Sequence, residues 1–154
     1  MASFYTNETK GRGDQPPRLL GNEAYGGRER VFRATIPLDA PPTSNTTAGT
    51  QIASGDTVVL CTRPAGMRFA GGTLVSSVSL GTAQIAVGVA GTPAKYRAAA
   101  VFTAVDTPTP FGPAARFADD APSADEEIIL TVSVAALPNT AGAKLVVDLY
   151  FAGP

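Results

Sequence analysis

The sequence predicts an all-β fold, a single antiparallel β-sandwich or jelly-roll-like barrel of about seven or eight strands, preceded by an extended N-terminal arm. Three observations predict it. The 154 residues include 16 Gly and 13 Pro, and both residue types disfavour helices. After residue 30, several segments alternate with a period of two, as strands with one buried face do. Short segments rich in turn-forming residues separate these runs.

Residues 1–30 are interpreted as the arm and residues 31–154 as the β-sandwich body. The arm shows neither helical nor strand periodicity and is interrupted by glycines and prolines. Residues 1–35 carry six basic and four acidic residues, a net charge of +2, whereas the remaining 119 residues carry six basic and nine acidic residues, a net charge of −3. We therefore expect a mildly basic arm that can lie on an acidic surface, its own or a neighbour's.

The body begins with two strands separated by a long connection. The first strand is expected at 31–36 and must end near Pro37, which has no N–H to donate to a neighbouring strand. Residues 40–56 are polar and rich in Pro, Gly, Ser and Thr, so we expect them to cross the surface. The alternating pattern resumes at 57–63, which is the second expected strand.

Three strands are expected in the middle of the chain. One lies near 67–80, with Gly71-Gly72 as a bulge or bend, and the next at 84–89. The third lies near 95–104, and four of its residues are expected to share one face: Tyr96, Ala98, Ala100 and Phe102. The Pro-rich segment 107–113 is expected to be a turn.

Two strands are expected near the C-terminus, at 127–134 and 144–151. Their expected inward faces consist of Ile128, Leu130, Val132 and Val134 in the first strand and Leu145, Val147, Leu149 and Phe151 in the second. One short helix is considered at Ser123, because Glu126 follows at the spacing of a capping box. Only one helical turn fits there before the strand.

Composition excludes several classes of function. The chain has no His, the usual general base and metal ligand, and a single Cys, so we expect no enzyme, no metal site, no cofactor and no disulfide framework. The net charge of −1 disfavours nucleic acid as a direct partner. No apolar run of about 18 residues is present, and the first residues lack the apolar centre of a signal peptide, so no membrane association is expected.

One acidic cluster could carry chemistry: Asp119, Asp120, Asp125, Glu126 and Glu127. Paired carboxylates hydrolyse glycosides, and clustered carboxylates bind hard cations such as calcium. The spacing does not match a calcium loop, and the surrounding Ala, Pro and Ser are typical of a loop. We interpret the cluster as a solvated acidic turn and leave cation capture as an open alternative.

Other motifs have plain structural interpretations. Cys61 lies on an expected strand and is interpreted as a buried structural thiol. Residues 91–95 lack the spacing of a phosphate-binding loop and are interpreted as a hairpin connection. Arg12-Gly13-Asp14 is the integrin-recognition tripeptide, but a three-residue motif recurs by chance.

The candidate partner-binding residues lie in the arm: Arg12, Arg18, Tyr25, Arg28 and Arg30. Arginine and tyrosine are well suited to contacts with another protein. Nearby acidic residues and the absence of Trp make single-stranded nucleic acid a weaker alternative.

The stretch from Ser54 to Phe151 resembles small structural proteins of tailed-bacteriophage virions. The resemblance rests on the GDTVVL strand, the MRFAGGTLVSSVSLGTAQIAVGVAGTPAKYRAA block, the FTAVDTPTPFG connection and the closing EEIILTVSVAALP and LVVDLYF strands. Size, the all-β body and the arm make a capsid cement, or decoration, protein the most similar type.

The resemblance implies a non-enzymatic protein on the capsid surface of the virion, assembled in the bacterial host cytoplasm. Its implied partner is the major capsid protein, and it would staple neighbouring capsomers as a homo-oligomer, a dimer or a trimer. Two alternatives remain: a phage tail or adsorption component that binds host-surface glycans, and a polysaccharide-cleaving enzyme that uses the acidic cluster.

Overall fold

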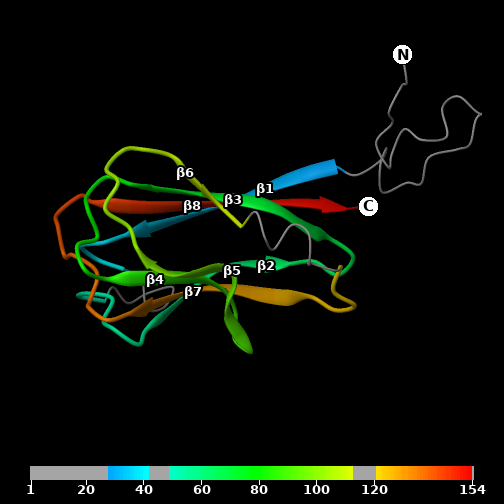
Figure 1. Ribbon diagram of the computed structural model, residues 1–154, viewed down its shortest axis with the longest axis horizontal. Helices are drawn as coiled ribbons and strands as arrows, with labels where there is room; N and C mark the ends of the chain where they lie inside the picture. Colours follow the sequence, from blue (N-terminus) through cyan, green and yellow to red (C-terminus); the bar gives the residue numbers. More distant parts are fainter. Residues whose placement is uncertain (1–27, 42–48, 113–120, 154) are drawn as a thin grey trace, which may run out of the picture.

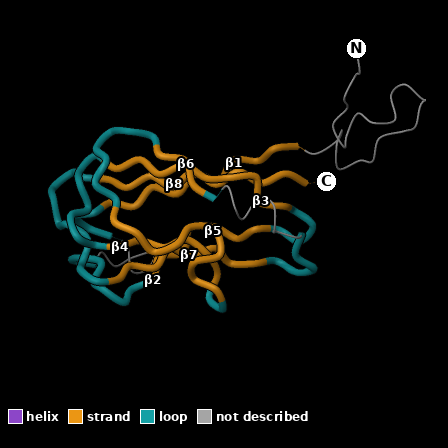
Figure 2. Tube along the Cα trace, viewed as in Figure 1, coloured by secondary structure: helices purple, strands orange, loops and turns teal. Residues whose placement is uncertain are grey.

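The computed structural model describes residues 28–41, 49–112 and 121–153. These residues form a sandwich of two four-stranded antiparallel sheets, which Figure 1 shows as two stacked layers. Figure 2 shows only strands and loops in the described part of the chain. No helix long and apolar enough to cross a membrane is found among these residues.

The strands are β1 (Arg28–Pro37), β2 (Thr57–Arg63), β3 (Arg68–Ser76), β4 (Gln84–Val89), β5 (Thr92–Val101), β6 (Thr109–Phe111), β7 (Glu126–Ser133) and β8 (Lys144–Gly153). One sheet has the order β1-β8-β3-β6 and the other β2-β7-β4-β5. Hydrogen-bonded neighbours run antiparallel in both sheets. The predicted all-β sandwich is therefore confirmed.

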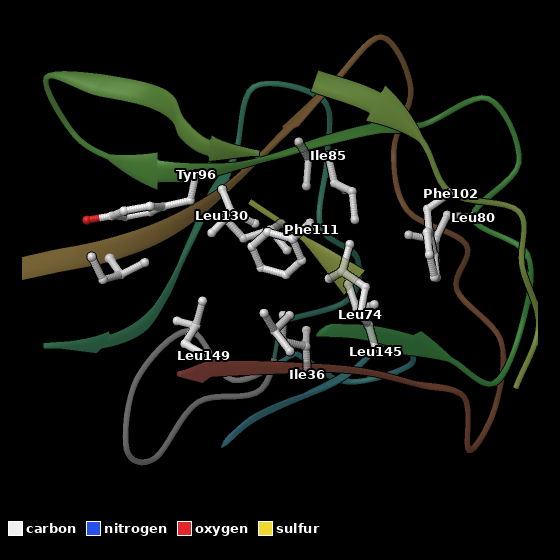
Figure 3. Packing of buried hydrophobic residues seen from close by; sticks show 14 of the residues in the cluster. Ile36, Leu74, Leu80, Ile85, Tyr96, Phe102, Phe111, Leu130, Leu145 and Leu149 are labelled. Carbon is white, nitrogen blue, oxygen red and sulfur yellow. The ribbon is translucent and has the colours of Figure 1, made fainter. Parts of the chain in front are cut away.

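The core lies between the sheets and follows the alternation of the C-terminal strands. The inward residues of β8, Leu145, Val147, Leu149 and Phe151, are each 0% exposed. Figure 3 shows side chains from both sheets pointing into this space, with the Phe111 ring among them. Burying a large apolar side chain stabilises a fold by about 1.5–3 kcal/mol, so this face is what holds β8 at the centre of its sheet.

The predicted bulge in β3 is present, but the strand is shorter than expected. The register with β8 shifts between Phe69 and Gly71, and Gly71 has a φ of 145°, which favours glycine. β3 ends at Ser76 rather than near residue 80, because the Ser76 hydroxyl donates to the Val78 carbonyl at 2.7 Å and turns the chain.

The expected shared face of β5 is wrong. Tyr96 and Phe102 are buried, but Ala98 and Ala100 are exposed, and β5 spans Thr92–Val101 rather than 95–104. The register with β4 shifts twice, between Ile85 and Val87 and between Val87 and Val89. These irregularities break the period of two on which the prediction rests.

The C-terminal end of β7 also departs from its predicted pattern. The sequence predicts Val134 on the inward face, but its φ is 72° and its exposure is 67%. The left-handed backbone at this residue ends the strand and turns the side chain outward.

Three loop predictions need correction. Thr109–Phe111, expected as a turn, is the short edge strand β6, where Pro110 is tolerated because an edge residue can lack an N–H partner. The capping-box helix is absent, since Ser123 lies in a bend and Glu126 begins β7. The connection after β1 is not wholly superficial, because Ile52 is only 6% exposed.

Candidate functional site

The predicted partner-binding residues fall into two groups. Arg12, Arg18 and Tyr25 lie outside the described residues. Arg28 and Arg30 belong to β1, where they are in register with Gly153 and Phe151 of β8. Arg30 is exposed. The structure thus places two of the five residues at the start of an edge strand.

An ionic cluster around the buried Arg63 links three strands of the second sheet. Arg63 at the end of β2 is 0% exposed, and its Nη2 lies 2.7 Å from Oε2 of Glu126, its cross-strand neighbour on β7. Lys95 Nζ of β5 lies 3.1 Å from Glu126 Oε1. The Tyr96 hydroxyl donates to Glu126 Oε2 at 3.2 Å.

Arg63 also connects the cluster to the opposite sheet. Its guanidinium carbon lies 5.7 Å from the ring centroid of Tyr96 and 5.9 Å from that of Phe151 on β8. Such cation–π contacts favour a cation that has been removed from water. The carboxylate balances two cations and accepts one hydroxyl, which ties the end of β2 and the middle of β5 to the start of β7.

A bulge in β2 hides this cluster from prediction by sequence alone. The register between β2 and β7 shifts between Val59 and Cys61, and the shift moves Arg63 onto the inward face. The sequence assigns Glu126 to a solvated turn, but its side chain is only 23% exposed. The usable signal would have been the acidic residue at the start of one strand and the basic residue at the end of its partner.

The remaining predicted chemical residues are inert or dispersed. Cys61 is half-buried, and desolvation raises its pKa to about 11, so the thiol stays protonated at neutral pH. Asp125 accepts a hydrogen bond from the Ala65 N–H at 3.0 Å. Asp119 and Asp120 lie outside the described residues, and within those residues no group of three potential ligands could hold a metal ion.

The sheet edges differ in how well they are protected from pairing with another strand. β6 has three residues and contains Pro110. β2 carries a bulge. β5 has two register shifts, and Arg97 donates to carbonyls of both β4 and β5, including Ile85 and, at 3.3 Å, Ala100. Bulges, prolines and charges of this kind block edge-to-edge association.

β1 is the exception among the edge strands of the described structure. It is ten residues long and pairs with β8 over its whole length without a register shift. Val31 on this strand is 56% exposed. A long, regular edge with an exposed apolar residue is a surface that another chain can extend.

A groove of about 850 Å³ adjoins this edge, between β1 of one sheet and β2 of the other. One side is formed by residues 34–37 and the other by residues 55–60, with Gln51 and Ile52 between them. Val59 on β2 is 58% exposed. We call β1 and this groove the β1 edge surface; it is the candidate interaction site of the described structure.

No protein-family model matches this chain, and no curated protein matches it. Chains from three solved structures share its fold. A chain of the structure "Cyanophage Pam1 capsid asymmetric unit" has a TM-score of 0.63 and 18% identity, covering 92% of this chain and 97% of that chain.

Two further structures are similar. A chain of "Capsid of Ralstonia phage GP4" has a TM-score of 0.62 and 16% identity, over 82% of this chain and 85% of that chain. A chain of "Acidic stable capsid structure of Helicobacter pylori bacteriophage KHP30" has a TM-score of 0.55 and 14% identity, over 82% of this chain and 88% of that chain. At these identities the likeness shows a shared fold.

Proposed function

We propose that this chain is a non-enzymatic structural protein of a phage virion, a capsid cement protein that binds the outer shell and staples neighbouring capsomers. The observation that carries the proposal is the shared fold with chains from three phage capsid structures, over 82–92% of this chain and 85–97% of theirs. Because the match covers most of each chain, it favours a similar role for the whole domain over the reuse of a shorter segment in a different role.

The side-chain chemistry of the described residues supports a structural role. Glu126 forms ion pairs with Arg63 and Lys95 inside the domain, and Cys61 is a protonated thiol at neutral pH. The other surface features that we describe are the sheet edges, exposed valines and the groove beside β1. These are means of contacting protein rather than of transforming a small molecule.

The proposed partner is the major capsid protein, contacted by the β body and by the N-terminal arm. The 27 residues that precede β1 would reach about 90 Å if fully extended, which is farther than the body itself could contact. Ordering a residue costs about 1–2 kcal/mol, so the arm binds where the shell offers compensating contacts. Arg12 and Arg18 of the arm, with Arg28 and Arg30 at the start of β1, would supply cations for an acidic shell surface.

The test is binding of the purified full-length protein to mature shells that lack it. Occupancy is measured by gel densitometry after sedimentation, and shell strength by the temperature at which the shells break. We expect saturable occupancy and a higher breakage temperature, because a ligand that binds only the assembled state stabilises it. Exposed charge contacts are screened by salt, so occupancy should fall as ionic strength rises.

Matched charge variants identify the contacts. Arg12→Gln with Arg18→Gln should lower occupancy at low salt, whereas Arg68→Gln with Lys144→Gln removes two body cations and should change it less. Failure of the wild-type protein to bind shells at low salt would contradict the cement role. Binding confined to the tail of native particles would support the tail or adsorption alternative instead.

A further inference from the structure

We propose that two copies of this chain pair through their β1 strands, antiparallel across a two-fold axis at Val31, so that two four-stranded sheets become one continuous sheet. The proposal concerns self-association and does not depend on shell binding. The edge strands differ in length and regularity. Of the four described edge strands, only β1 is ten residues long and pairs with its neighbour without a register shift. Strand addition to such an edge supplies main-chain hydrogen bonds.

The exposed residues of β1 are complementary to those of a second copy of the same strand. Glu29, Val31 and Arg33 alternate along the strand and are all exposed, with Val31 at 56%. A two-fold axis at Val31 places the partner's Val31 opposite it and covers both apolar side chains. The same register puts Glu29 opposite the partner's Arg33, and by symmetry Arg33 opposite the partner's Glu29. Opposite charges in directly facing positions stabilise a strand pair.

The neighbouring registers are less favourable. An axis at Arg30, Glu29 or Arg33 would place like charges directly opposite each other, which destabilises a strand pair. An axis at Phe32 would place Val31 opposite Arg33 and Glu29 opposite Thr35, so it would form neither the apolar pair nor the charge pairs. Arg33 is also held in place for the proposed contact: its Nε lies 2.7 Å from Asp148 Oδ1 and its Nη2 2.8 Å from Oδ2. Its side chain is still 67% exposed. The pairing would therefore create a row of alternating charges, Asp148, Arg33 and the partner's Glu29, across the joined sheet.

The register keeps the paired stretch within β1. With Val31 on the axis, residues 28–34 of the two copies pair. Pro37, which lacks an N–H, falls beyond the paired stretch. An isologous pair of this kind is closed, so it does not propagate into fibres.

A cysteine on the axis tests the geometry in the full-length protein. Val31→Cys in a Cys61→Ala background should give a disulfide-linked dimer under mild oxidation, because facing residues of an antiparallel pair lie within disulfide range. Val59→Cys in the same background is the control, since Val59 has matching exposure, 58% against 56%. Rapid linkage at position 31 with little at position 59 supports the proposal, and equal or absent linkage at position 31 contradicts it.

Charge exchange tests the register. Glu29→Lys alone and Arg33→Glu alone each place like charges opposite at both symmetric positions, and we expect a dimer Kd raised about tenfold or more in sedimentation. Mixing the two variants should restore dimers, because positions 29 and 33 then carry opposite charges in both facing pairs of the mixed dimer. Glu127→Lys, the same charge change on an exposed residue of β7, should dimerise like wild type. A wild-type monomer or trimer, or variants that dimerise normally, would overturn the proposal.

Discussion

Arg63 shows what a single buried charge requires of its neighbours. It is 0% exposed, and its guanidinium is paired with Glu126, which is itself shared with Lys95 and Tyr96. Removing one partner of a buried ion pair destabilises a protein more than replacing both, because the remaining charge stays uncompensated.

We therefore predict that Glu126→Ala lowers the free energy of unfolding by about 3 kcal/mol or more. The double variant Arg63→Met with Glu126→Ala should recover part of that loss. Denaturant unfolding measures both. Glu127→Ala, on the exposed neighbour, is the control and should change stability by no more than about 0.5 kcal/mol. Equal effects of the two alanine variants would show that the cluster is not structural.

Cys61 gives a pH-dependent prediction. Burial raises its folded-state pKa to about 11, whereas an unfolded thiol has a pKa of about 8.5. The folded state therefore holds the proton more tightly than the unfolded state. The resulting contribution to the free energy of unfolding is fully present below about pH 8.5 and is lost as the pH rises through about 11. Wild type should lose more stability than Cys61→Ala over this interval in unfolding measurements at each pH. Parallel curves for the two proteins would contradict the assignment.

At the scale of elements, the β4–β5 hairpin depends on close backbone approach at Gly88. A Cβ at this position would lie 2.2 Å from the Thr92 carbonyl oxygen, which is backbone and cannot rotate away. We predict that Gly88→Ala costs about 2 kcal/mol of stability, as other overpacking substitutions do. Gly91→Ala in the same hairpin is the control, because nothing lies within 4 Å of its Cβ position. Similar melting temperatures for the two variants would refute the close approach.

The strands that could be predicted from the sequence are those whose one face is buried along their whole length. β8 is the clearest case, since its alternation continues unbroken from Leu145 to Phe151 and all four inward residues are fully buried. The inward faces of β2 and β5 could not be predicted in the same way. Register shifts in these strands change which residues face inward, and the local sequence does not show where the shifts occur. β6 has only three residues, too few for a period to appear.

The site was less predictable than the fold for the same reason. Whether β1 is an edge strand is a property of strand order, which brings β8 rather than β2 beside it. The sequence assigned Arg28 and Arg30 to the arm as contact residues. That residues 28–30 continue the alternation of Val31 and Arg33 along an open edge strand is visible only once the sheet is assembled.

At the scale of the whole molecule, we propose that residues 28–153 fold without the preceding segment. Every residue of the described core cluster lies between Phe32 and Phe151. Removal of residues 1–27 should therefore leave a cooperative thermal transition in circular dichroism. Removal of residues 1–37 takes away β1, including the buried Ile36, and should abolish or strongly weaken that transition. Loss of cooperativity in the shorter truncation would mean that residues 1–27 belong to the core.

The most direct test of the cement role is a cryo-electron microscopy reconstruction of intact virions that contain this chain. We expect density for the eight-stranded sandwich at symmetry-related positions over the outer shell, in contact with neighbouring major capsid proteins. Density for the sandwich confined to the tail, with a bare outer shell, would contradict it.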